Sequence, residues 1–456
     1  MVALAFALTV LNAPMRAQAG QYTITETSGS QPGDALGTVG LSDTGFLCAS
    51  MNDPALEAFR WSPRGGVVMR PPAPTGLTWG DTTAVNVNDV GTVVGFFGTD
   101  IGGFSLTRGY RWQAGVSAEL LDPTGNRAFP QAINAEGWIV GYAGGHAAGT
   151  PGAVIWAPDL RPSFVDGLDR ATDINDAGLL VGYRRDLTPP YTTHGYLRDS
   201  RRRGGLVSLG TLDPRGVGDV VPLAIDSLGR VVGWSKINGR QHAFLWTSST
   251  GMRELPGPAA PQPSDVSAVD INDAGWILGY APTAQDGRAV VLWSPDGAVH
   301  EVEPLISDLG PGHSWERLWD IQRINSSGQL AGSALRAGAI RHVLLTPAAL
   351  TASALVPARA GVVNSLVVSG AVPGRRVFLV GDREDPLDRG TTVIPGCRSM
   401  GLAMQHPHVA AQGVADAGGQ ALLEWSVPPS LAGVAIRLQA FQFGGCAVSQ
   451  VVHVTL

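Results

Sequence analysis

The stretch Asp270-Ile271-Asn272-Asp273-Ala274-Gly275-Trp276-Ile277-Leu278-Gly279 decides the fold, because its pattern occurs seven times along the chain. In each copy an aliphatic residue precedes Asn, Asp or Ser, and a glycine stands three residues after that polar residue. A second glycine follows four residues later in six copies. Asn or Asp with such a glycine is typical of a tight turn in which glycine adopts a positive φ. The seven turn glycines are Gly45, Gly91, Gly137, Gly178, Gly229, Gly275 and Gly328.

Each copy reads as four short strands. A strand ends at the aliphatic residue, a second follows the turn, a third often ends in Trp, and a glycine-containing turn leads to a fourth. Four strands in roughly 45 residues are typical of a β-propeller blade. We therefore predict an all-β protein with a seven-bladed propeller over residues 20–350. The seventh unit loses its fourth strand, so we expect the spare strand at residues 21–27 to close the last blade.

The propeller repeat resembles a known bacterial repeat. His242-Ala243-Phe244-Leu245-Trp246, together with the Asn-Asp turns, is similar to the extracellular repeat called HAF after its His-Ala-Phe. The resemblance covers roughly residues 20–350 and implies a secreted protein without a defined catalytic motif. His occupies this position in three units only, as His194, His242 and His342.

The repeat stops before a different C-terminal region. Residues 357–456 carry alternating strands between Gly and Pro turns, which predicts an immunoglobulin-like or jelly-roll β-sandwich after a linker at 351–356. Cys397 and Cys446 both lie in this region, and in an oxidising compartment we expect them to form a disulfide. Cys48 stands alone and is expected to be a buried free thiol. The region is similar to C-terminal appendages of secreted bacterial surface proteins that carry a Pro-Gly-Cys and a late Cys-x-Val-Ser.

The N-terminus predicts export. Residues 2–11 are apolar and Ala17-Gln18-Ala19 resembles a signal-peptidase site, so residues 1–19 read as a signal peptide. Ten apolar residues are too few for a bilayer span. The 456 residues include 60 Gly and 32 Pro, are 44% hydrophobic, and carry a net charge of −6. This composition fits a globular chain and gives no basic footprint for nucleic acid. We expect an extracellular or cell-surface monomer with no membrane span in the mature chain.

Candidate functional residues fall into two groups. Long, variable loops share one end of the blades, and binding on a rigid scaffold usually occurs on such loops. Aromatic side chains could stack on sugars there or pack between blades. These candidates are Phe96, Tyr142, Tyr183, Tyr191, Trp234, Tyr280 and Trp315. If the protein is an enzyme, its acid–base groups are expected in the least repeat-like stretch. They are Glu303, Asp308, His313 and Glu316.

No nucleophile-elbow, zincin, P-loop or dinucleotide-binding motif occurs in the chain. The repeated Asp-x-Asn departs from a calcium loop, because Ala177 stands at a ligand position, so we interpret it as turn chemistry. We therefore expect no cofactor or metal. The sequence favours a secreted binding, adhesion or structural module for extracellular carbohydrate or protein. The alternative is an extracellular hydrolase or lyase acting on a polysaccharide or other polymer.

Overall fold

The computed structural model describes residues 22–27, 34–52, 56–63, 65–69, 81–101, 104–144, 152–202, 205–258, 265–282, 287–295, 297–306, 308–347, 350–371, 376–383, 392–393, 401–402, 408–415, 420–442 and 447–456. Within them the protein is all-β, and its only helices are two three-residue 3₁₀ turns, η1 (Glu303–Leu305) and η2 (Pro429–Leu431).

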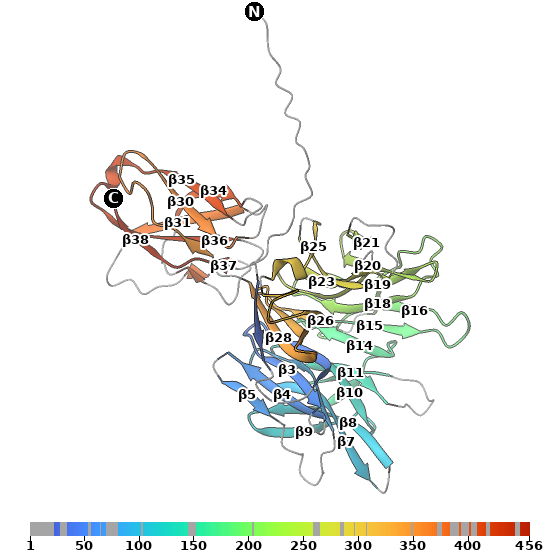
Figure 1. Ribbon diagram of the computed structural model, residues 1–456. Coiled ribbons are helices and arrows are strands. Elements are labelled where there is room, and N and C mark those ends of the chain that lie inside the picture. Colours follow the sequence, from blue (N-terminus) through green and yellow to red (C-terminus); the bar gives the residue numbers. More distant parts are fainter. Residues whose placement is uncertain are drawn as a thin grey trace, which may run out of the picture.

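Seven four-stranded antiparallel sheets form the propeller (Figure 1). The first three blades pair their strands in sequence order. Blade 1 contains β2 (Asp34–Leu41), β3 (Leu47–Asn52), β4 (Leu56–Ser62) and β5 (Gly66–Met69). Blade 2 contains β6 (Thr82–Val87), β7 (Val93–Ile101), β8 (Phe104–Gln113) and β9 (Val116–Leu120). Blade 3 contains β10 (Ala128–Ile133), β11 (Ile139–Ala143), β12 (Ala153–Trp156) and β13 (Pro162–Phe164).

Blades 4 to 6 follow the same order. Blade 4 contains β14 (Arg170–Ile174), β15 (Leu179–Arg185), β16 (Thr193–Asp199) and β17 (Val207–Ser208). Blade 5 contains β18 (Val220–Ile225), β19 (Val231–Ile237), β20 (Arg240–Thr247) and β21 (Gly251–Glu254). Blade 6 contains β22 (Ser267–Ile271), β23 (Ile277–Pro282), β24 (Arg288–Trp293) and β25 (Val299–Glu301).

Blade 7 joins the two ends of the propeller sequence. It contains β26 (Arg317–Ile324), β27 (Leu330–Arg336) and β28 (Ala339–Pro347), and β1 (Tyr22–Glu26) pairs antiparallel with β28 as the outer strand. An N-terminal strand thus completes the last sheet, and the ring has no open first or last blade. The seven-bladed propeller expected from the sequence is confirmed.

The hydrophobic cores lie between adjacent blades. One cluster joins Ala224 and Val232 of blade 5 to Ile271, Ile277 and Trp293 of blade 6. The Trp residues at the ends of third strands belong to these cores, and Trp156 and Trp293 are fully buried. Their indole N–H groups donate to the carbonyls of Leu121 and Pro256, which satisfies the polar atom of each buried ring.

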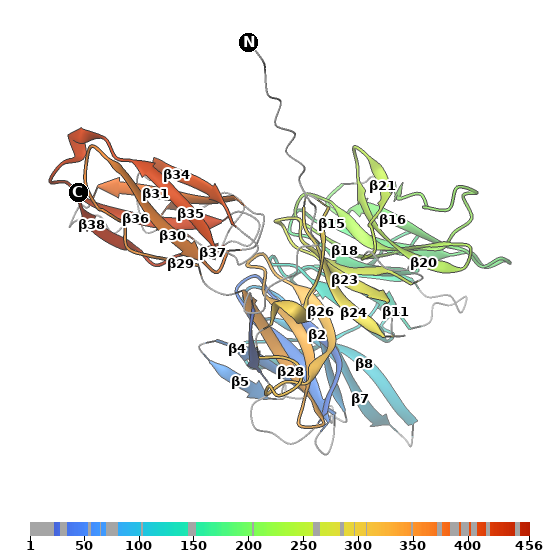
Figure 2. The ribbon, with the colours of Figure 1, turned by 45° about the horizontal axis from the view of Figure 1, so that its top comes forward.

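The C-terminal region is a β-sandwich, as expected. Two sheets face each other (Figure 2) and share one core that includes Leu366 and Val368 from one sheet and Leu379 and Leu438 from the other. One sheet contains β29 (Thr351–Ala352), β30 (Val363–Ser369) and β35 (Ala421–Ser426). The other contains β31 (Arg376–Arg383), β34 (His408–Val414), β36 (Ala435–Gln442), β37 (Ala447–Val448) and β38 (Val452–Thr455). The short strands β32 (Thr392–Val393) and β33 (Gly401–Leu402) pair separately.

The segment 351–356, expected to be a linker, belongs to the C-terminal sandwich in the structure. β29 lies within it and pairs with β30, and Leu355 is buried in the sandwich core. Burial of apolar residues explains the difference, because Leu350, Ala352 and Leu355 belong to the core of the sandwich. The strands of the second domain therefore begin before Pro357.

Candidate functional site

The propeller has two faces that the connections define. The turn face carries the seven Asn/Asp-x-x-Gly turns between first and second strands, and the loop face carries the connections at the opposite blade ends. All seven turn glycines have a positive φ, from 74° at Gly328 to 88° at Gly137. The turns surround the central channel, where they line a cavity of about 170 Å³. We name the first polar residues of the seven turns the axial ring. They are Ser42, Asn88, Asn134, Asn175, Asp226, Asn272 and Asn325.

Every axial-ring side chain closes its own turn. The Oδ1 atom of Asn134, for example, accepts the Trp138 N–H at 2.9 Å, and the equivalent bond occurs in all seven blades. This is the Asx-turn chemistry expected from the sequence. A side-chain oxygen that accepts from the backbone four residues later stabilises the turn and leaves that oxygen poorly placed for a metal ion.

The amide groups of the axial ring also connect neighbouring blades. The Nδ2 atom of Asn134 donates to the Asn175 carbonyl at 3.1 Å, and five of the seven junctions have this bond. Ser42 and Asp226 have no amide N–H. Arg230 replaces it in blade 5 by donating to the Asp273 carbonyl, and Thr44 replaces it in blade 1 by donating to the Asp89 carbonyl.

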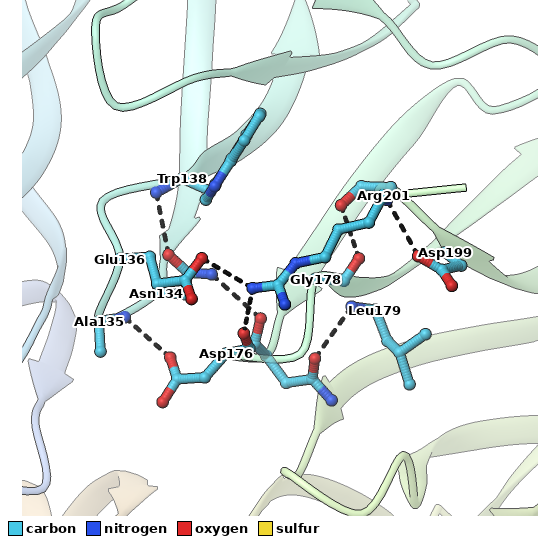
Figure 3. A network of polar contacts seen from close by, with 11 residues as sticks. Asn134, Ala135, Glu136, Trp138, Asp176, Gly178, Leu179, Asp199 and Arg201 are labelled. Carbon is cyan, nitrogen blue, oxygen red and sulfur yellow. Dashed lines mark hydrogen bonds and ion pairs between the residues drawn. The ribbon is translucent and has the colours of Figure 1, made fainter. Parts of the chain in front are cut away.

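Arg201 strengthens one junction of the turn face (Figure 3). Its guanidinium pairs with Glu136 of blade 3 at 2.7 Å and donates to the Asp176 carbonyl of blade 4. Ala135 N–H also crosses this junction to Asp176 Oδ1. Arg201 therefore takes part in blade-to-blade contact, whereas Arg202 pairs with Asp199 of its own hairpin.

A second cavity of about 130 Å³ lies deeper in the channel, next to the inner strands. Its carboxylates connect blades in the same way. Asp173 accepts the N–H of Ile174 in its own blade and of Ile225 in the next blade, both at 2.9 Å. Asp270 likewise accepts the N–H groups of Ile271 and Ile324. Each inner strand has a β-bulge just before these residues, which turns such N–H groups away from the sheet ladder.

These contacts give blades 3 to 6 a period of two blades. At the position one residue before the aliphatic residue, blades 4 and 6 carry Asp, whereas blades 3 and 5 carry Ala132 and Ala224. One carboxylate serves its own blade and the next, so the next blade needs no polar group there. Blade 7 departs from the alternation, because Arg323 stands where this pattern would place a small residue.

Burial perturbs the acids of the channel. Desolvation raises the pKa of Asp270 to about 7, although the Arg323 charge and two backbone N–H groups oppose the shift. Burial also raises the pKa of Asp173 in spite of the same kinds of stabilising contact. At the turn face, burial raises the pKa values of Asp43 and Asp226. The channel is therefore a place where negative charge is costly.

Several aromatic candidates contact residues of a neighbouring blade. Phe96 packs edge-on against Phe129 of blade 3 at 5.8 Å, and Arg170 of blade 4 lies 3.9 Å from the Tyr142 ring centroid. Tyr280 is buried, and its hydroxyl donates to the Ile321 carbonyl of blade 7 at 2.7 Å. Trp315 is buried in the core that joins blades 6 and 7.

The other aromatic candidates are more accessible. Tyr183 and Trp234 are half-buried, and Lys236 lies 5.7 Å from the Trp234 ring. Tyr191 is 48% exposed at the tip of the β15–β16 hairpin. The candidates therefore divide into rings between blades and rings that face solvent.

The carboxylates among the candidate catalytic residues each bind a different backbone N–H. Glu303 accepts the Leu318 N–H at 2.7 Å, Asp308 the Ser314 N–H at 3.2 Å, and Glu316 the Gly338 N–H at 2.9 Å. His313 is exposed and lies 3.7 Å from Asp308. Each carboxylate fixes a backbone N–H, and none of the four residues lines either channel cavity.

The described residues hold no group of three or more His, Cys, Asp or Glu suited to a metal ion. Cys48 is buried and free. Cys397, Cys446 and the expected signal peptide lie outside the described residues, so the disulfide and the leader stay predictions. Over the same part of the chain, no helix has the length and apolar character needed to cross a membrane.

The comparisons with known proteins concern the fold. No family model and no curated protein sequence matches the chain. Among solved structures it is similar to PorZ, a bacterial surface component of the type-IX secretion system of Porphyromonas gingivalis. The identity is 12%, the match covers 91% of this chain and 58% of that chain, and the TM-score is 0.44.

Two archaeal structures are also similar. One is the β-propeller domain of the Trilobed protease from Pyrococcus furiosus, with 10% identity and a TM-score of 0.40. The match covers 64% of this chain and 91% of that chain. The other is an acylaminoacyl peptidase from Pyrococcus horikoshii, with 10% identity and a TM-score of 0.44, and the match covers 77% of this chain and 60% of that chain. The propeller assignment rests on the seven four-stranded sheets of the chain itself, and the HAF likeness stays a resemblance.

Proposed function

We propose that the protein is an exported surface module that binds extracellular carbohydrate or protein through its loop face. The carrying observation is the tip of the β15–β16 hairpin, where Leu187 is 74% exposed and Tyr191 is 48% exposed. Large apolar side chains together at a protruding tip favour contact with a partner.

Hydrogen bonds hold the tip of the hairpin. Asp186 N–H donates to the Thr192 carbonyl at 2.9 Å, and Tyr191 N–H donates to the Thr188 carbonyl at 2.8 Å. His194 lies 2.9 Å from Asp186, and Asp219 of the next blade accepts the Thr193 N–H at 2.8 Å. A loop that is ordered before binding loses less conformational entropy when a partner docks.

The chemistry of the tip suits a sugar or a protein surface. The Arg185 guanidinium lies 5.9 Å from the Tyr191 ring, so a flat aromatic face and a positive charge occur together. Tyr and Arg are the residue types that supply much of the binding energy in interfaces. The expected candidate Tyr191 is thus central to this proposal.

The alternative of a hydrolase or lyase has weaker support. Glu303, Asp308 and Glu316 each hold a backbone N–H. General acid–base catalysis needs two groups within reach of one substrate bond. A polysaccharide-cleavage assay that gave turnover would favour the alternative over the binding module.

The binding proposal is tested on arrays of glycans and bacterial cell-wall fractions with the folded full-length protein. We expect at least one ligand class to bind, and Tyr191→Ala to weaken that binding about tenfold or more. Leu228→Ser is the matched control, because Leu228 is 73% exposed on the turn face. No binding by the wild-type protein, or equal loss in both variants, would contradict the proposal.

A further inference from the structure

We propose that the deeper channel cavity binds a small zwitterion of the size of glycine or alanine, with Arg323 holding its carboxylate and Asp173 and Asp270 holding its ammonium group. This inference concerns the channel and does not rest on the loop-face function. The observations that carry it are the place of Arg323 in the ring, its hydrogen bonds, the charges around it and the size of the cavity.

Arg323 has no role in the contacts between blades. In blades 4 and 6 the residue at this position supplies oxygen atoms to two neighbouring inner strands. Asp270 already serves blade 7 by accepting the Ile324 N–H at 2.8 Å. The ring would therefore close with a small residue at position 323, as at Ala132 and Ala224, and the guanidinium is an addition to that scheme.

The Arg323 guanidinium has hydrogen-bonding capacity to spare. Its Nη1 atom donates to the Gln322 carbonyl at 3.1 Å. Arginine has five N–H donors, and within the described part of the chain the remaining donors of Arg323 have no protein partner. A carboxylate satisfies two such donors at once, because its geometry matches the guanidinium fork.

The two carboxylates have capacity of the opposite kind. Each oxygen of Asp173 and Asp270 accepts one backbone N–H, and a carboxylate oxygen has two acceptor sites. A primary ammonium group supplies three donors, so it can contact both residues.

Charge decides between ligand classes. In the described structure neither Asp173 nor Asp270 comes within 4.0 Å of Arg323, so the opposite charges line one cavity without forming an ion pair. A simple anion would meet the two carboxylates, and a simple cation would meet the guanidinium. A molecule with both charges can pair its carboxylate with Arg323 and its ammonium group with Asp173 and Asp270. Such ion pairs are stronger in a poorly solvated cavity than in water.

The cavity has a matching size and adjoins the turn-face cavity. Its volume is about 130 Å³, which corresponds to about four water molecules at roughly 30 Å³ each. This is the size range of the smallest α-amino acids. The turn-face cavity of about 170 Å³ shares Leu41, Asn86, Asp173 and Ile324 with it, so the two cavities adjoin along the channel.

The test is calorimetric titration of the full-length protein with L-alanine, acetate and ethylamine at pH 7.5. We expect alanine to bind at least tenfold more tightly than acetate and ethylamine, which carry only one of its charged groups. No heat with alanine at millimolar concentration, or equal affinity for either single-charge probe, would overturn the proposal. The three probes need no variant, so the result does not depend on the folding of a mutant.

A pair of substitutions locates the site. Arg323→Gln should weaken alanine binding at least tenfold while the near-ultraviolet circular dichroism stays that of the wild type. Arg317→Gln is the matched control, because Arg317 is an exposed arginine of the same strand outside the cavity. Unchanged affinity in a folded Arg323→Gln variant would overturn the assignment. If the wild-type protein binds alanine but binds no glycan or cell-wall fraction, the loop-face function is contradicted and the channel site is not.

Discussion

The turn face and the loop face belong to the same strands, but they use their polar groups differently. On the turn face, the side chains of the axial ring donate and accept within their own turn and across to the next blade. On the loop face, the tip of the β15–β16 hairpin leaves Leu187 and Tyr191 exposed. The difference teaches that the repeated residues maintain the ring, whereas the residues that vary between blades are available for contact.

The largest effect is expected where the repeat brings two backbones together. Gly141→Ala places a Cβ 2.0 Å from the Phe129 carbonyl oxygen, so the backbone of the paired inner strand would have to shift. We expect a loss of at least about 3 kcal/mol of stability or a failure to fold, measured by urea unfolding. Gly98→Ala is the control, because its Cβ meets nothing closer than 3.7 Å. Equal stability of the two variants would show that the close approach is not needed.

The second largest effect is expected in the pH dependence of stability, through the titration of Asp270. Its pKa rises from 3.8 unfolded to about 7 folded. Stability from this group is therefore full below about pH 4 and falls as pH rises through 7, by on the order of 4 kcal/mol. Asp173 shifts in the same direction and Arg323 opposes both. We expect Asp270→Asn to be less stable than the wild type at pH 5 and to lose less stability by pH 8. Parallel thermal-unfolding profiles from pH 4 to 8 would contradict this.

A smaller effect is expected at the axial ring. Asn134→Ala leaves the Trp138 N–H and the Asn175 carbonyl without their side-chain partner. We expect a loss of about 2 kcal/mol, because two hydrogen bonds are removed. Asn126→Ala, in an exposed turn, serves as the control and should change stability by less than about 0.5 kcal/mol. The comparison between the faces fails if both substitutions cost the same.

The smallest effect on stability is expected at the tip of the loop face. Tyr191→Ala should change the free energy of unfolding by less than about 0.5 kcal/mol, since Tyr191 is 48% exposed at the tip of a hairpin. Thermal unfolding measured together with ligand binding separates the two roles. A marked loss of stability would mean that the tip supports the ring.

Much of the fold could be predicted from the sequence, because turn chemistry and spacing are local. The turn glycines and the terminal Trp residues marked blades that the sheets confirm. The blade-to-blade bonds of Asn134 and Asp173 were not predicted, since a single turn does not show which atoms the ring brings together. A signal was present, because the residue before the aliphatic position alternates between Asp and Ala over blades 3 to 6.

The candidate site was harder to predict. Phe96 and Tyr142 share a sequence phase with Trp234, yet the first two contact residues of the next blade, Phe129 and Arg170. The exposure of each ring depends on the size of the side chain that faces it from the next blade. That side chain is distant in sequence, so the repeat alone does not show it. Arg323 was missed for a related reason, because it stands out only when the alternation of its neighbours is known.

The two-blade alternation meets an arithmetic obstacle in a ring of seven. An odd number of units cannot alternate around a closed circle, so two units of the same kind must meet at one junction. In this ring that parity fault lies between blades 7 and 1, where the side chain of Gln322, and not an Asp, accepts the Val39 N–H of blade 1 at 3.0 Å. The fault is also where the two ends of the propeller sequence join through β1 and β28. Symmetry thus frees one inner position from the common pattern, and that position holds Arg323.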